Sequence, residues 1–205
     1  MIGERKMAVS LKKGEKVELR KSNGATLHHV MVGLGWDAKL PPKKSGILGF
    51  FQSQPKIDCD ASVVMFQNGK FVSQGDIIYY HNLQHSSQAV RHTGDNRSGK
   101  GDGDDEQIIV NLDKLPPEYD QLFFVANIYE ATRRNQHFGM IQNAFIRIVD
   151  QDTNTEIYRF DLADSYDGMK SMKFGILYKQ DNNWKFHALG EGTTDDSLQN
   201  LIKSI

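Results

Sequence analysis

The sequence predicts an all-β protein, an antiparallel β-sandwich of about ten strands with one or two short peripheral helices, one of them C-terminal. Three observations favour this fold class. Short apolar runs with a period near two recur along the 205 residues, turn-forming clusters such as Asp152 to Thr155 separate them, and only two segments have helical character. A parallel sheet would need a crossover helix between successive strands, and the spacing leaves no room for such helices.

The first strands are expected at residues 17–19, 30–36 and 63–66. Asn68 and Gly69 follow the third run and precede Lys70 to Val72. This pair predicts a hairpin with a type I′ turn, because both central residues of that turn need a positive φ. Further strands are expected at residues 76–80, 107–112, 122–129, 143–149, 157–162, 171–179 and 184–189.

Two helices are expected at the periphery. One is a short turn near residues 114–120, where Pro116 and Pro117 are compatible only with its start. The other covers residues 195–204 and places Leu198, Leu201 and Ile202 on one face. Residues 1–6 are expected to form an N-terminal extension, and residues 7–205 a single domain.

The composition argues against several classes of protein, beginning with nucleic-acid-binding proteins. The chain has 25 basic and 26 acidic residues and a net charge of -1, so no basic excess points to nucleic acid as a partner. The single cysteine, Cys59, excludes an intramolecular disulfide. Because no N-terminal apolar stretch resembles a signal peptide or a membrane span, we expect a cytoplasmic protein.

The most distinctive segment is residues 94–106, GDNRSGKGDGDDE, which holds five acids, two bases and four glycines. Glycine allows backbone carbonyls to turn inward, and carboxylates supply the hard oxygens that Ca²⁺ takes in sets of six to eight. A second acidic pair, Asp58 and Asp60, stands at the start of a predicted strand, where alternate residues share a face. The two segments together predict a cation site, since like charges about 4 Å apart repel by roughly 4 kcal/mol near a surface. The alternative is a solvated acidic loop.

Six segments resemble, in order, the TerD-type tellurium-resistance and general stress proteins. They are SLKKGEKVEL at residues 10–19, GLGWD at 33–37, IDCDAS at 57–62, HTGDNRSGKGDGDDE at 92–106, FGMIQNAFIRIVD at 138–150 and WKFHALGEG at 184–192. The resemblance implies a Ca²⁺-binding bacterial β-sandwich that acts in resistance to tellurite and related stress, without an established reaction. It also implies partners among other tellurium-resistance proteins, including membrane-associated ones.

The resemblance also assigns the metal ligands. The family's acidic pattern falls on nine positions of this chain: Asp37, Asp58, Asp60, Asp95, Asn96, Asp102, Asp104, Asp105 and Glu106. Without Asp37, seven carboxylates and Asn96 exceed what one Ca²⁺ needs, so two neighbouring ions that share carboxylates are the preferred interpretation. One ion with spare acids is the alternative.

The segment 39–56 is longer than its counterpart in compact family members. Its Ile47, Leu48, Phe50 and Phe51 lie beside two lysines, a composition suited to docking on an anionic membrane or a partner. The alternative is that these aromatic residues fold back onto the sandwich.

The sequence offers weaker signals for two other types of site, a zinc or cysteine site and a phosphoesterase centre. His81, His85 and His92 with Cys59 lack a regular zinc-ligand spacing, and the acids on both sides of Cys59 disfavour a reactive thiol. Asp-rich sites also occur in metal-dependent phosphoesterases, but the sequence has no GxSxG, P-loop or HExxH motif. We therefore expect that the protein is not an enzyme. The alternatives are a metal-dependent phosphoesterase and a Ca²⁺-dependent membrane-docking module.

Overall fold

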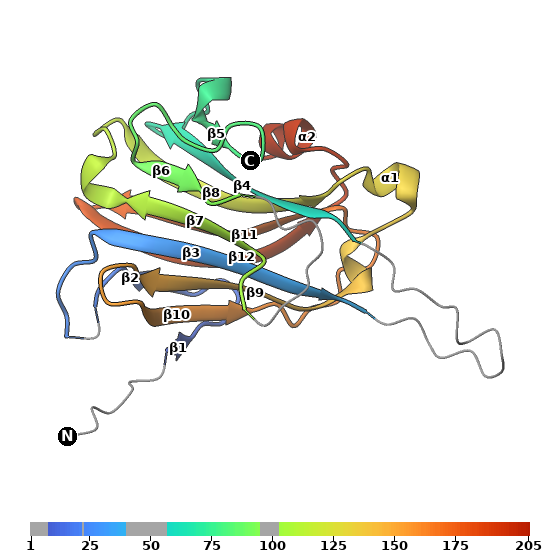
Figure 1. Cartoon of the computed structure of the whole chain (residues 1–205), viewed down its shortest axis with the longest axis horizontal. Coiled ribbons are helices and arrows are strands. Elements are labelled where there is room, and N and C mark those ends of the chain that lie inside the picture. Colours follow the sequence, from blue (N-terminus) through green and yellow to red (C-terminus); the bar gives the residue numbers. More distant parts are fainter. Residues whose placement is uncertain (1–7, 22, 40–56, 95–102) are drawn as a thin grey trace.

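The computed structural model describes residues 8–21, 23–39, 57–94 and 103–205. Within these residues the chain forms two six-stranded sheets packed face to face (Figure 1), which confirms the predicted β-sandwich. The first, which we call the β3 sheet, has the order β1 (Val9–Ser10), β10 (Thr155–Asp161), β9 (Ile141–Asp150), β3 (His29–Ala38), β7 (Glu106–Asn111) and β6 (Val90–His92). The second, the β4 sheet, has the order β2 (Lys16–Glu18), β12 (Asn183–Thr193), β11 (Ser171–Gln180), β8 (Tyr119–Ile128), β4 (Cys59–Gln67) and β5 (Ile77–Ile78). Among these pairings only β1 with β10 is parallel.

The main core lies between the two sheets. Alternate residues of β3, such as Val30, Val32 and Leu34, point into it and are fully buried. Residues of β4 are buried on both sides, because Val63 faces this core while Val64 packs in a second apolar cluster on the outer face. This double burial explains why residues 63–66 of β4 form a continuous apolar run and not an alternating one.

The helices are short. The C-terminal helix α2 (Leu198–Lys203) is confirmed, begins after Ser197, whose Oγ accepts from the Asn200 amide, and buries Leu198 and Leu201 in the outer cluster of the β4 sheet. Figure 1 shows α2 near β4 and β5. The other helical segments are α1 (Ala131–Arg134), η2 (Gln74–Asp76), η3 (Leu112–Lys114) and η4 (Phe138–Met140).

The predicted helical turn at residues 114–120 is wrong. The turn is η3, which ends at Lys114, and β8 already begins at Tyr119. The Asn111 side chain caps η3 by accepting a hydrogen bond from the Lys114 amide, so the turn starts earlier than the prolines suggested.

The Asn68–Gly69 turn is confirmed, with φ values of 51° and 72° as a type I′ turn requires. It is closed by a single bridge between Gln67 and Lys70. Residues 70–72 do not continue as a strand, and β4 takes β8 and β5 as its neighbours instead. Since β5 pairs only with Val63 and Val64, the beginning of β4 has a free edge among the described strands.

Candidate metal centre

Glu106 joins the two sheets at this free edge of β4. It is the first residue of β7, it is 2% exposed, and its Oε2 accepts a hydrogen bond of 2.6 Å from the Ala61 amide of β4. The end of the acidic segment 94–106 therefore contacts β4 at the residue that follows Asp60, where the β3 sheet meets the β4 sheet.

His92 supports the Glu106 carboxylate from the side. The Gly94 amide donates to His92 Nδ1 over 3.1 Å, so the imidazole proton lies on Nε2. That nitrogen is 3.3 Å from Glu106 Oε2 and donates to it. His85 belongs to a different buried network with Asp76 and Tyr119, so these two histidines do not converge on one zinc site.

Asp105 lies along β3. Its backbone amide donates to the Leu34 carbonyl over 2.8 Å, and its Oδ2 accepts from the Trp36 amide over 2.7 Å. Burial raises the pKa of this carboxyl to about 6, the Trp36 hydrogen bond partly offsets the rise, and the charges of Asp37, Glu106 and Asp104 add to it. Burial is thus the main cause of the raised pKa, and three neighbouring carboxylates contribute to it as well.

The same concentration surrounds Cys59. Burial is the main reason that the pKa of its thiol stands well above the usual value, and the next causes are the charges of Asp60, Glu106, Asp58 and Asp105. Carboxylates from both acidic segments thus act on one sulfur atom. The fully buried, protonated thiol is a poor nucleophile and a poor metal ligand.

Two other candidate ligands, Asp58 and Asp37, each contact a side chain from outside the acidic segments. Asp60 is 6% exposed, and Asp58 Oδ2 lies 3.6 Å from Arg134 Nη1 of α1. Asp37 Oδ2 accepts from Asn143 Nδ2 over 2.8 Å.

Asp104 forms a two-pronged ion pair with Arg147 of β9, with distances of 2.6 and 2.8 Å. The successive residues Asp104, Asp105 and Glu106 thus bind Arg147, the Trp36 amide and the Ala61 amide, on three different strands.

Asp58, Asp60, Asp105 and Glu106 all lie close enough to Cys59 to raise the pKa of its thiol. Asp95, Asn96 and Asp102 lie outside the described residues. Within the described part of the chain, no group of three or more His, Cys, Asp or Glu side chains is arranged to hold a metal ion. The candidate donors at the β7 and β4 contact are carboxylate oxygens, the hard donors that Ca²⁺ takes, and the protonated Cys59 thiol offers no thiolate.

The sequence analysis did not assign Arg147, Gly33 or Gly35 to the site. A Cβ atom built on Gly33 would lie 2.3 Å from Asp104 Oδ1, and one on Gly35 would lie 2.8 Å from the Gly103 carbonyl oxygen. Glycines inside a predicted strand were the available signal, since they often mark the close approach of another chain segment.

We expect Gly33→Ala to destabilise the protein by about 2 kcal/mol, because the added methyl group displaces the buried Asp104 carboxylate. Urea unfolding followed by circular dichroism measures this change. Gly75→Ala is the control, since its φ is not positive and a Cβ there meets only Ser73 Oγ at 3.5 Å, an ordinary contact distance. Equal losses at both positions would contradict the steric explanation.

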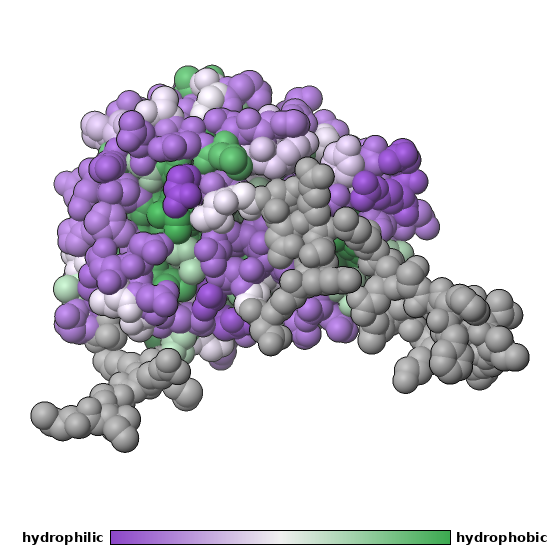
Figure 2. Space-filling model, in the orientation of Figure 1, coloured by the Kyte–Doolittle hydropathy of each residue, from purple (hydrophilic) through white to green (hydrophobic). Residues whose placement is uncertain are grey.

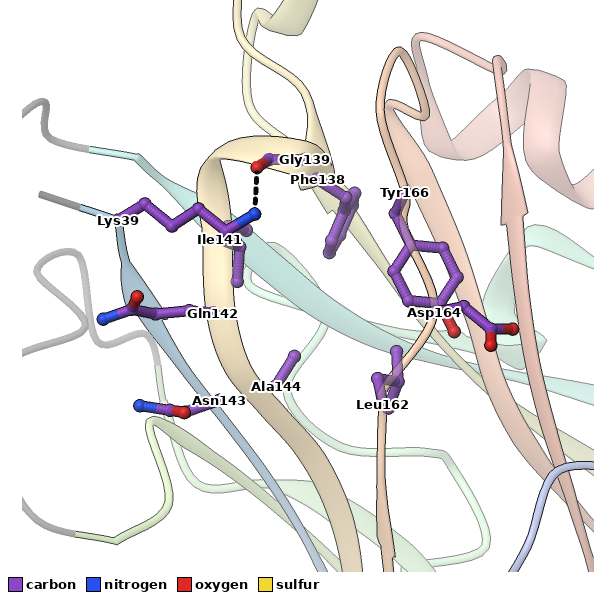
Figure 3. Close-up of a pocket in the computed structure, with 10 residues that line it drawn as sticks. All are labelled: Lys39, Phe138, Gly139, Ile141, Gln142, Asn143, Ala144, Leu162, Asp164 and Tyr166. Carbon is purple, nitrogen blue, oxygen red and sulfur yellow. Dashed lines mark hydrogen bonds between the residues drawn. The ribbon is translucent and has the colours of Figure 1, made fainter. Parts of the chain in front are cut away.

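A pocket of about 330 Å³, including space open to solvent, lies between η4, the start of β9 and residues 162–166 (Figure 3). Its polar groups are engaged elsewhere: Lys39 donates to the Gly139 carbonyl, Tyr166 to the Gly190 carbonyl, and Asp164 pairs with Lys13. Figure 3 shows Gln142 and Asn143 pointing away from Tyr166. The pocket lining does not suggest a phosphoesterase centre.

Comparison with known proteins identifies the chain. Residues 7–204 match the TerD domain family. The chain belongs to the TerD domain family. It is 49% identical over 201 residues to stress response protein SCP2 of Bacillus subtilis (strain 168), with 96% of this chain and 98% of that protein covered. It is 42% identical over 187 residues to tellurium resistance protein TerD of Serratia marcescens, with 91% of each chain covered.

The fold is shared as well. A crystal structure described as a homologue of telluride resistance protein (TerD) from Streptomyces coelicolor A3(2) matches with a TM-score of 0.61 and 17% identity, covering 84% of this chain and 94% of that chain. Both TerD-family relatives compared by sequence are named as resistance or stress proteins and not as enzymes.

No helix in the described part of this TerD-family chain has the length and apolarity needed to cross a membrane. On the face shown in Figure 2, described apolar residues form small separate patches among hydrophilic ones.

Proposed function

We propose that this TerD-family protein is a non-catalytic, calcium-binding stress protein of the cytoplasm. In this proposal Ca²⁺ orders residues 94–106 against the start of β4, and the ordered surface supports assembly with other tellurium-resistance proteins, including membrane-associated ones. The observation that carries the proposal is the hydrogen bond from the Ala61 amide to Glu106, since it holds the end of one acidic segment beside the residue that follows Asp60.

The charge of the site supports a divalent cation. Four described carboxylates act on Cys59, and one of them, Asp105, has a pKa of about 6. Bringing such groups together without a counter-ion costs free energy, and a cation removes that cost. Asp58, Asp60, Asp105 and Glu106 would supply described ligands, with Asp95, Asn96 and Asp102 from the same acidic segment and Asp37 beside it. Two ions remain our preferred number, because this set is larger than one ion requires.

Membrane docking through Ile47, Leu48, Phe50 and Phe51 stays a prediction, because these residues lie outside the described part of the chain. We also propose that residues 7–205 act as one domain.

Calcium binding is tested with the metal alone. We expect heat of binding in calorimetry and, with free Ca²⁺ a hundredfold above its dissociation constant, a stabilisation of about 2.7 kcal/mol. For a chain of this size the gain corresponds to a rise of about 5–10 °C in melting temperature, which EDTA should reverse.

The variant Asp58→Asn/Asp60→Asn should lose most of this response. Asp164→Asn serves as the matched control, because its carboxylate pairs with Lys13 at the surface. If the wild-type protein shows neither heat nor an EDTA-sensitive rise in melting temperature, the calcium proposal is wrong.

A further inference from the structure

We propose that Asp104 is an anchor and not an ion ligand, and that its ion pair with Arg147 fastens residues 103–106 to the outer face of the β3 sheet in the position that binds calcium. This inference rests on the proposed calcium function. It makes Arg147 a positioning residue, 43 positions away in sequence from the carboxylate it holds.

The hydrogen bonds of Asp104 leave little capacity for an ion. Oδ1 accepts from Arg147 Nε, and Oδ2 accepts from Arg147 Nη2 and from Gln107 Nε2, over 2.6, 2.8 and 3.0 Å. The side chain of Asp104 is 0% exposed. A forked pair of this kind is among the strongest and most directional hydrogen-bond arrangements in proteins. Arg147 is itself held, because its Nη1 donates to Glu156 over 2.8 Å.

The surface beneath the anchor is shaped to receive it. Gly33 lies directly opposite Arg147 in the pairing of β3 with β9, on the face turned away from the core. Because Gly33 has no side chain, the Asp104 carboxylate can lie over β3 and reach Arg147 on the neighbouring strand. Gly35 in the same way leaves room for the Gly103 carbonyl.

The anchor determines the direction of the next two carboxylates. In a regular strand Asp104 and Glu106 would share a face. Here the chain bends at Asp105, so Asp104 lies on the outer face while Glu106 is buried against the Ala61 amide. With Asp104 held outside, Asp105 is positioned beside the Trp36 amide and Glu106 beside β4.

The two possible roles of Asp104, anchor and ligand, predict opposite changes in calcium affinity when the Arg147 side chain is removed. If Asp104 were a ligand, Arg147 would compete with the ion, and its removal would tighten calcium binding. If Asp104 is an anchor, removal of either partner lets residues 103–106 move, and binding must order the equivalent of one more residue. That ordering weakens affinity by about fivefold to thirtyfold.

Calorimetric titration with Ca²⁺ compares R147Q, D104N and the double variant with the wild-type protein. We expect both single variants to bind about fivefold to thirtyfold more weakly, and the double variant to be no weaker than either within about twofold. R159Q is the matched control, because Arg159 pairs with Arg147 in strand register but bonds Asp161 and contacts the Phe145 ring. R147K, which keeps the charge and loses the fork, provides a second variant with an intermediate loss should R147Q fold poorly.

Tighter binding in R147Q, or affinity unchanged in D104N and R147Q, would overturn the anchor. If the wild-type protein binds no calcium, the proposed function fails, and the anchor is then decided by amide hydrogen exchange in the metal-free protein. The amides of Asp105 and Trp36 should exchange about tenfold faster in R147Q and D104N but not in R159Q. Unchanged exchange in both variants would overturn it.

Discussion

Glu106→Ala is expected to destabilise the metal-free protein by about 4 kcal/mol. The substitution removes the acceptor of two buried donors, the Ala61 amide at 2.6 Å and His92 Nε2 at 3.3 Å. A buried donor left without a partner costs about 1–3 kcal/mol, and the lost side-chain volume adds to that cost. The loss should be large because the affected hydrogen bond is buried and joins β7 of one sheet to β4 of the other.

Urea unfolding in EDTA measures the effect, with Glu191→Ala, at an exposed position of β12, as the control. Glu106→Gln separates stability from metal binding, because its amide oxygen still accepts from Ala61 while the charge is gone. We expect this variant to lose less than about 2 kcal/mol of stability and nearly all of its calcium response. A loss under about 1 kcal/mol in Glu106→Ala would show that the contact does not join the sheets.

Asp105→Asn is expected to stabilise the metal-free protein at neutral pH by about 1–2 kcal/mol. The folded-state pKa of Asp105 is about 6, above its ordinary value of 3.8, so the folded protein favours the protonated carboxyl. Between these two values the folded state holds more protons than the unfolded state, and stability therefore falls as pH rises. The full difference would correspond to about 3 kcal/mol, and solvent screening of this half-buried carboxyl reduces it to about 1–2 kcal/mol. Asparagine is uncharged at every pH and still offers an oxygen to the Trp36 amide.

The difference between Asp105→Asn and wild type in EDTA should be near zero at about pH 4 and reach a plateau above about pH 6.5. Excess calcium should reverse the order, because the wild-type protein alone gains the full binding energy. Asp164→Asn, at an exposed surface pair, should show no such pH profile. If the difference in unfolding free energy stayed constant across this pH range, the charge of Asp105 would not be what destabilises the metal-free protein.

These two variants separate stability from function at adjacent positions. Glu106 both supports the fold and adds to the charge of the site, whereas Asp105 costs stability unless a cation is bound. We expect natural selection to retain such a destabilising carboxylate only where its charge is used. The pair therefore tests the calcium proposal independently of the anchor formed by Asp104 and Arg147.

The sequence by itself determined the sandwich, the Asn68–Gly69 turn and the C-terminal helix, because period-two patterns, positive-φ turn residues and helix caps act over a few neighbouring residues. It also predicted that the two acidic segments meet. It did not locate the first helical turn, since Asn111 capped an earlier start.

Only the tertiary structure decided where each carboxylate points. A bend at Asp105 places Asp104 and Glu106 on opposite faces, and their partners, Arg147 and Ala61, come from strands far away in the chain. A local pattern records which residues are acidic, but the partner that neutralises each acid depends on which strands become neighbours. That choice is made by the packing of the whole sandwich.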